Sequence, residues 1–293
     1  GGGGGGGGLV GPNGAGKTTV VRILATLLGP DQGQAFVDGC NVVTEAHGVR
    51  QRIGLTGQYA SVDEKLTGRE NLLLIARLLG LSRPDARARA TELLAQFSLS
   101  DAAQRPVATY SGGMRRRLDL AASLVGRPGI LFLDEPTTGL DPRARLDLWN
   151  LIRRLVAEGT TVLLTTQYLE EADALADDLV VLDQGRVIAE GTPAQLKARI
   201  GAQTLVVTAS TEEQVSALRE CVQAVVGRTP ELDGRRVMVP LSDPALLTTV
   251  VRALDERGLT VEELMLRGAS LDDVFLSLTG RHVPEDDPEE TRV

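Results

Sequence analysis

Apolar positions along the chain follow two spacings, and each predicts a different element. Ile130–Leu133 and Thr161–Thr166 are nearly continuous apolar runs, which indicate strands buried on both faces. Apolar residues at helical spacing predict helices over residues 17–28, 67–79 and 142–157. The first two-thirds of the chain therefore combines buried strands with amphipathic helices.

Start and stop signals agree with these helices. Gly29-Pro30 ends the first helix, and Thr67 with Glu70 forms a capping box at the start of the second. Asp141-Pro142 supplies the third with an N-cap and a proline at its first position. Two hairpin turns are also predicted, at Asp38-Gly39 and Asp183-Gln184-Gly185.

After residue 200 the pattern changes to shorter alternating elements. Strands are predicted at 205–207, 236–239 and 261–266, and helices at 213–225, 244–257 and 271–278. This alternation predicts a small α+β domain over residues 201–281, as in a ferredoxin-like fold. The segment has no carboxylate, histidine or cysteine cluster, so assembly or regulation is a better interpretation than catalysis. The acidic, proline-containing residues 282–293 predict a disordered tail.

Composition narrows the class of protein. Of the 293 residues 42% are hydrophobic but only 3% aromatic, so the core must be mainly aliphatic, with Trp149 packed into it. The formal net charge of −8 argues against a nucleic-acid partner, which would need a basic surface. No apolar run approaches the ~20 residues of a membrane-spanning helix. Two cysteines, Cys40 and Cys221, are too few for a disulfide framework and favour a reducing cytosol.

The first eight residues are all glycine, and only Leu9 and Val10 of an expected strand follow them. Glycine is a poor strand former because it loses much backbone entropy on folding and has no side chain to pack. We therefore expect residues 1–8 to be flexible low-complexity chain, and we interpret the run as an artefact or a truncated N-terminus.

Residues 11–18 match the phosphate-binding pattern G-x-x-x-x-G-K-[ST]. Such a loop wraps its backbone N–H groups around a phosphate, which requires glycines such as Gly14 and Gly16. Lys17 reaches the terminal phosphates, and the hydroxyl of Thr18 can bind Mg²⁺. The following helix directs its positive N-terminal end at the anion.

Two further segments carry polar groups at positions where a bound ligand could be contacted. Asp134 and Glu135 follow the buried strand at Ile130–Leu133, where ligands of open α/β sheets bind. Asp134 is suited to hold Mg²⁺, and Glu135 is placed to polarise an attacking water. Ser111-Gly112-Gly113 opens a helix and offers a second anion-binding N-terminus, although alone this pattern is a common cap.

Together these motifs resemble those of the ATP-binding cassette (ABC) ATPases. Tyr110–Met114 resembles the Leu-Ser-Gly-Gly-Gln signature, with both flanking residues changed. Gly139–Asp141 resembles the D-loop, and Gln58 matches the Q-loop glutamine. The resemblance covers residue 9 to about 200. It implies an α/β P-loop ABC ATPase core with a helical subdomain at about 66–125, followed by the small α+β domain. Within the family, residues 57–64, 165–172 and 271–275 resemble the ATPase subunits of daunorubicin/doxorubicin resistance exporters.

The resemblance also implies roles for particular residues. The expected catalytic residues are Lys17, Glu135 and Gln167. The residues expected to bind Mg²⁺ are Thr18, Gln58 and Asp134. The residues expected to bind ATP are Gly11, Pro12, Asn13, Gly14, Ala15, Gly16, Lys17, Thr18, Thr19, Gln58, Ser111, Gly112, Gly113 and Asp141. Each ATP is expected between Lys17 and Thr18 of one copy and Ser111 and Gly113 of another, in a homodimer.

Gln167 departs from the general family, which has a histidine at this position, and resembles the resistance-type subfamily. His47 and His282 lie outside every nucleotide motif. An amide can donate and accept hydrogen bonds but does not titrate near pH 7. We interpret Gln167 as a variant that holds geometry without a proton switch.

The function implied is that of an ATP-hydrolysing subunit at the cytoplasmic face of the cell membrane, which drives efflux of a drug or other amphipathic molecule through a separate integral-membrane permease. One alternative is a soluble ABC ATPase of a non-transport machine, but the chain lacks the coiled-coil heptads or second cassette usual there. Another is a scaffold that only binds nucleotide, against which Lys17, Asp134 and Glu135 argue.

Overall fold

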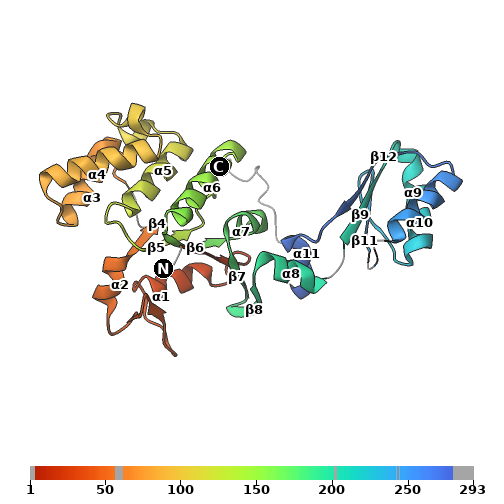
Figure 1. Ribbon diagram of the computed structural model, residues 1–293, viewed down its shortest axis with the longest axis horizontal. Coiled ribbons are helices and arrows are strands. Elements are labelled where there is room, and N and C mark those ends of the chain that lie inside the picture. The colour runs from red at the N-terminus through yellow and green to blue at the C-terminus, as the bar shows by residue number, and fades with distance from the viewer. Residues whose placement is uncertain (1–3, 57–61, 201–202, 242, 244, 280–293) are drawn as a thin grey trace. The chain divides into compact units, whose positions relative to one another are not determined.

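The computed structural model describes residues 4–56, 62–200, 203–241, 243 and 245–279, and it divides into two compact units (Figure 1). The first unit contains the chain up to Pro193 and the second begins at Ala194. The domain limits expected from the sequence, with a boundary at 200, stay a prediction. The expected disordered tail at 282–293 lies outside the described residues.

The first unit is built on a six-stranded sheet with the order β4-β5-β6-β1-β7-β8. All neighbours are parallel except β7 and β8, which form an antiparallel hairpin. The strands are β1 (Gly6–Val10), β4 (Ile53–Thr56), β5 (Ile130–Asp134), β6 (Thr161–Thr166), β7 (Asp178–Asp183) and β8 (Arg186–Gly191). The parallel sheet confirms the expected α/β class and the two buried strands.

The glycine run contributes to the sheet, contrary to our expectation. β1 begins at Gly6 and pairs with β6 on one side and β7 on the other. The expectation that the strand consists of Leu9 and Val10 alone was therefore wrong, and so was uniform flexibility for Gly6–Gly8. Neighbouring strands supply hydrogen bonds on both sides, and this tertiary pairing overrides the poor strand propensity of glycine.

Helices surround this sheet (Figure 1). They are α1 (Lys17–Leu24), α2 (Ala46–Arg52), α3 (Gly68–Leu78), α4 (Arg83–Gln96), α5 (Gly112–Ser123), α6 (Pro142–Ala157) and α7 (Leu169–Leu175), with 3-10 turns at Ser100–Ala102 and Val107–Thr109. The capping box of α3 and the Asp141 cap of α6 are confirmed. A separate hairpin joins β2 (Phe36–Val37) and β3 (Cys40–Asn41) through the predicted turn.

One predicted helix end was wrong. The sequence pattern extended the first helix to residue 28, but α1 ends at Leu24 because Thr26 adopts a left-handed conformation with φ 62°. The N–H groups of Leu27 and Leu28 donate to the carbonyl of Arg22, which closes the helix end. Both leucines are about half exposed rather than part of the core.

Residues between β4 and β5 are mainly helical, as expected. The helices α3, α4 and α5 share a core with α6 and with strands β5 and β6. Buried Leu118 of α5, Leu133 of β5 and Trp149 of α6 all belong to this cluster. The helix that carries Ser111 at its start is thus packed against the elements that carry the Asp-Glu pair.

The second unit contains a four-stranded antiparallel sheet with the order β10-β11-β9-β12. Its strands are β9 (Gln203–Ala209), β10 (Glu231–Asp233), β11 (Arg236–Leu241) and β12 (Val261–Arg267), and its helices α8 (Pro193–Ile200), α9 (Val215–Val226), α10 (Leu246–Glu256) and α11 (Leu271–Thr279), with a 3-10 turn at Glu212–Gln214. The succession β9-α9-β10-β11-α10-β12 in this strand order is ferredoxin-like. The short β10 was not predicted.

None of the helices in the described part of the chain is long and apolar enough to cross a membrane.

Candidate functional site

The loop between β1 and α1 lies at the carboxyl end of a central strand. Gly14 and Gly16 have φ values of 81° and 104°, a conformation that favours glycine. A Cβ on Gly11 would lie 2.2 Å from the carbonyl oxygen of Leu182, so the close approach of two backbones requires glycine there as well. The loop is further held by the N–H of Gly185, which donates to the carbonyl of Ala15 at 3.1 Å.

Lys17 is buried at the centre of this loop, with only 4% of its surface exposed. Its Nζ donates to the carbonyls of Gly11 (2.8 Å) and Pro12 (3.1 Å) and lies 3.5 Å from Oε1 of Glu135. Burial lowers the pKa of Lys17 from 10.5, and the negative charges of Glu135 and Asp134 oppose this shift. The loop thus holds a concentrated positive charge beside its backbone N–H groups.

Asp134 is fixed by two hydroxyl groups at the end of β5. Oγ1 of Thr18 donates to its Oδ1 at 3.2 Å, and Oγ1 of Thr165 donates to the same oxygen at 2.6 Å. The predicted pair of Mg²⁺ ligands, Thr18 and Asp134, is therefore together in the structure. One hydroxyl and one carboxylate suit Mg²⁺, which prefers oxygen ligands and keeps several waters. Among the described residues there is no group of three or more His, Cys, Asp or Glu side chains arranged to hold a metal.

Glu135 follows in a strained conformation with φ 47°, which is unusual for a residue with a side chain. Its N–H donates to both the carbonyl and the hydroxyl of Thr165, each at 3.1 Å. Its carboxylate lies between Lys17 and Thr138, whose hydroxyl is 3.5 Å from Oε2. The strain turns the carboxylate toward the phosphate-binding loop instead of continuing along the strand.

Arg116 of α5 was missed by the sequence analysis. Its guanidinium donates to the carbonyls of Pro136 (2.7 Å), Asp134 (3.1 Å) and Glu135 (2.9 Å). Burial lowers the pKa of Arg116, and nearby carboxylates, Asp119 first among them, oppose that shift. The planar fork of an arginine matches this row of carbonyls, which a lysine could not engage in the same way. No local pattern could indicate it, because the contact joins segments about twenty residues apart.

Gln167 follows β6 directly and is 7% exposed, so the structure places it at the same sheet edge as Val10 and Asp134. Behind it lies Glu171, fully buried, whose Oε1 accepts from Nε1 of Trp149 at 3.0 Å. Burial raises the pKa of Glu171, and the hydrogen bond from Trp149 partly offsets this. The sequence analysis assigned Trp149 to the core, which is confirmed, but did not identify its bond to Glu171.

Ser111 and Gly112 of the signature are exposed at the start of α5, and Gly113 is half-buried. Ser111 caps the helix by accepting from the N–H of Met114 at 3.3 Å, and Gly112 follows it. In the described part of the chain, no hydrogen bond or ion pair joins Ser111–Gly113 to residues 11–18. Asp141 caps α6 by accepting from the N–H of Ala144 at 2.9 Å. The structure therefore brings together five residues at the carboxyl edge of the parallel sheet: Lys17, Thr18, Asp134, Glu135 and Gln167. In the described part of the chain, Ser111–Gly113 make no hydrogen bond to these five. Gln58 lies outside the described residues.

Comparison with known proteins gives a consistent result. Residues 4–138 match the ABC transporter family. The daunorubicin resistance ATP-binding protein DrrA2 of Streptomyces coeruleorubidus is 54% identical over 285 residues, or 96% of this chain and 88% of the relative. The daunorubicin/doxorubicin resistance ATP-binding protein DrrA of Streptomyces peucetius is 51% identical over 281 residues, covering 95% and 84%.

Solved structures are similar as well. One is the dimer of an ATP-binding cassette in a post-hydrolysis state bound to ADP and phosphate. It has a TM-score of 0.58 and 27% sequence identity, and the match covers 65% of this chain and 86% of that one.

Proposed function

This chain belongs to the ABC transporter ATP-binding proteins and is an ATPase of that family, and from this premise we propose how its residues bind and hydrolyse ATP. The observation that carries the proposal is the convergence of Lys17, Thr18, Asp134 and Glu135 at the carboxyl ends of β1 and β5. A buried ammonium, two carboxylates and a row of loop N–H groups in one place form a site suited to a polyphosphate.

In this proposal the phosphate-binding loop holds the β- and γ-phosphates of ATP. Lys17 exchanges part of its contact with Glu135 for the γ-phosphate, which leaves that carboxylate to accept a proton from the attacking water. Thr18 and Asp134 would hold Mg²⁺, which neutralises phosphate charge. Arg116 keeps the backbone at Asp134–Pro136 in place, so that Glu135 retains its orientation through the reaction. Gln167 contacts the γ-phosphate or the water through its amide.

We further propose that two copies share each ATP, with Ser111–Gly113 of one copy completing the loop of the other. The exposed start of α5 supports this, because in the described part of the chain no hydrogen bond joins Ser111–Gly113 to residues 11–18. The relatives are named as daunorubicin or doxorubicin resistance ATP-binding proteins, and the matching family is that of ABC transporters. On this basis we propose that the chain serves the export of a drug or similar amphipathic molecule, with a membrane partner, at the cytoplasmic face of the membrane. These names favour transport over a soluble non-transport machine.

The test separates binding from hydrolysis. Lys17→Ala should weaken ATP binding by at least tenfold, because it removes the charge that faces the phosphates. Glu135→Gln should bind ATP within about threefold of the wild type but hydrolyse it about 10²–10⁴-fold more slowly, because only the general base is lost. Equilibrium binding and steady-state phosphate release measure the two effects. Equal loss of binding in both variants would show that the roles are assigned wrongly.

A further inference from the structure

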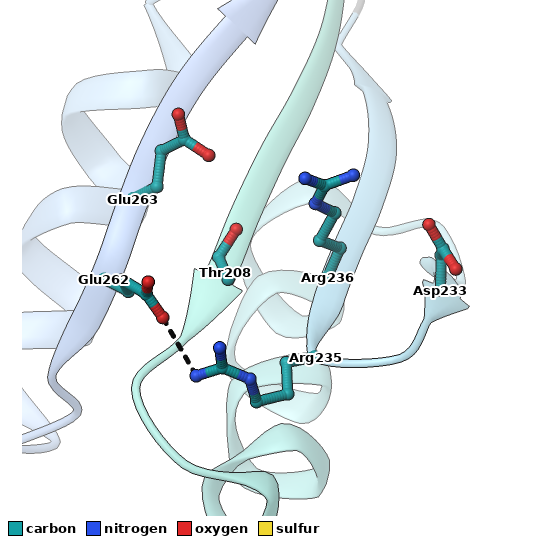
Figure 2. A pocket seen from close by; sticks show the side chains of 6 residues that line it. All are labelled: Thr208, Asp233, Arg235, Arg236, Glu262 and Glu263. Carbon is teal, nitrogen blue, oxygen red and sulfur yellow. Dashed lines mark ion pairs between the residues drawn. The ribbon is translucent and has the colours of Figure 1, made fainter.

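One face of the sheet in the second unit is covered by helices. The other face lies outside the hydrophobic core that those helices form with the sheet. Leu205, Val207 and Ala209 of β9 point into a core with α9 and α10. Because side chains alternate along a strand, Thr204, Val206 and Thr208 point to the opposite face. In Figure 2 the helices lie behind the sheet and the labelled side chains stand in front of it. We call this second side the open face.

The pairing of the strands places the side chains of the open face in three rows across β11, β9 and β12. The first row is Arg236, Thr208 and Glu263, the second Met238, Val206 and Met265, and the third Pro240, Thr204 and Arg267. The first row thus carries a positive charge on one side of Thr208 and a negative charge on the other (Figure 2). The second row is apolar: Met265 is 42% exposed and Met238 half-buried, while Val206 between them is buried.

The charges of the first row are not used within the unit. In the described part of the chain neither Arg236 nor Glu263 has an ion pair, whereas the neighbouring Arg235 pairs with Glu262 at 2.9 Å. Oγ1 of Thr208 is buried and has no hydrogen-bond partner among the described residues. Thr208 also lines a depression of about 530 Å³ with five charged residues, which are Asp233, Arg235, Arg236, Glu262 and Glu263. A buried hydroxyl without a partner costs stability unless something else completes it.

We propose that the open face binds the open face of a second copy of this chain, about a two-fold axis that runs along β9. Rotation about this axis places β11 of one copy over β12 of the other. Arg236 then faces the partner's Glu263, and Met238 faces the partner's Met265. Thr208 and Val206 lie on the axis but are buried within each copy, so the flanking pairs Arg236–Glu263 and Met238–Met265 make the contact.

The alternative axis, across the strands, fits less well. It would place Glu263 over the partner's Arg267, which already pairs with Asp273 at 3.5 Å, and Arg236 over the partner's Pro240. The axis along β9 places Arg236 opposite the partner's Glu263 at both ends of the first row.

The contact should be weak by itself. Three strands about 4.8 Å apart and three rows of side chains about 6.8 Å apart give a face of about 300 Å² per copy, below the roughly 800 Å² per partner of a standard interface. Self-association through this face alone should therefore appear only at high protein concentration. This inference does not rest on the proposed roles in ATP hydrolysis.

The test uses two full-length chains of opposite charge, without nucleotide and in a Lys17→Ala background that excludes dimerisation through ATP. One chain carries Arg236→Glu and the other Glu263→Arg. Each should self-associate at least tenfold more weakly than the parent, because like charges then face each other in both pairs. Mixed together, they should form a heterodimer with parental affinity, since both pairs are restored across the interface. Sedimentation equilibrium measures the association.

Matched controls carry the same charge changes elsewhere on the unit. Arg252→Glu and Glu256→Arg alter exposed residues of α10, on the helical side of the sheet. Neither variant should change the affinity of self-association, and mixing the two should not increase it. The milder Arg236→Gln should weaken association by two- to fivefold, and thermal melting checks that each variant is folded. A parent that stays monomeric at every concentration overturns the proposal, as does a mixture of charge variants that fails to associate.

Discussion

The proposed ATP site combines charged groups that local motifs place with contacts from distant segments that hold them. Lys17, Thr18, Asp134 and Glu135 could be predicted from motifs, because each motif fixes its residue at the end of a strand or the start of a helix. That Thr165 holds Asp134 and that Arg116 binds three successive carbonyls could not be predicted. Both contacts join distant segments, and they depend on how α5 and β6 pack around β5.

The lowered pKa of Lys17 predicts how ATP affinity depends on pH. Phosphates favour the charged form of Lys17, so affinity should fall as pH rises through its pKa, by up to tenfold per pH unit. Because burial sets that pKa below 10.5, the fall should begin at lower pH than for an ordinary lysine. Glu135→Gln removes a charge that raises the pKa and should move the fall to still lower pH. Binding titrations from about pH 7 to 10 measure both chains, and a shift upward in Glu135→Gln would contradict the account.

Arg116 provides a test of positioning separate from charge. Arg116→Lys keeps the positive charge but loses the fork that engages three carbonyls, so hydrolysis should fall about tenfold or more while ATP affinity changes little. The matched control is Arg115→Lys, because Arg115 lies on the same helix and pairs with Glu64 instead. Steady-state kinetics distinguish the two. A loss confined to KM, or an equal loss in Arg115→Lys, would show that Arg116 does not act through the Glu135 backbone.

At the scale of elements, periodicity and capping predicted most helices of both units and the buried strands, since those signals are local. They failed at α1, where Thr26 in a left-handed conformation ends the helix early, and at β1 and β10, and they gave no prediction for α2, α7 and α8. β1 forms from glycines because it lies between β6 and β7, and β10 is a three-residue edge strand. Pairing partners far along the chain determine both, and a short sequence window does not contain them.

The glycines of β1 should respond differently to an added methyl group. A Cβ on Gly7 would meet Leu163 at 3.4 Å, an ordinary contact, so Gly7→Ala should stabilise the fold by about 0.4–1 kcal/mol through the unfolded state. A Cβ on Gly6 would lie 2.5 Å from the carbonyl oxygen of Leu175, so Gly6→Ala should destabilise it. Denaturant unfolding of the two variants measures the difference. The same effect in both would mean that β1 does not pair as described.

At the scale of the whole molecule, the account requires two copies for one reaction. Ser111–Gly113 could be recognised from sequence. Only the fold shows that, in the described part of the chain, no hydrogen bond joins this segment to residues 11–18. The second unit is ferredoxin-like, with a row of unpaired charges that no sequence pattern indicates, because β11, β9 and β12 come together only in the sheet.

The most direct measurement mixes two inactive chains. Lys17→Ala disables the phosphate loop, and Gly112→Asp places a negative charge at the start of α5, where the structure leaves room for a Cβ. A mixed dimer contains one site with both lesions and one with neither. Half of the dimers in an equal mixture are mixed and one of their two sites is intact, so about a quarter of wild-type ATP hydrolysis should return.

Gly112→Ala is the control, because it adds the Cβ without the charge and should keep most of the activity alone. Phosphate release from each chain separately and from the equal mixture decides the matter. Recovery in the mixture, with neither Lys17→Ala nor Gly112→Asp active alone, is the predicted result. A mixture no more active than its two components would contradict an ATP site shared between two copies.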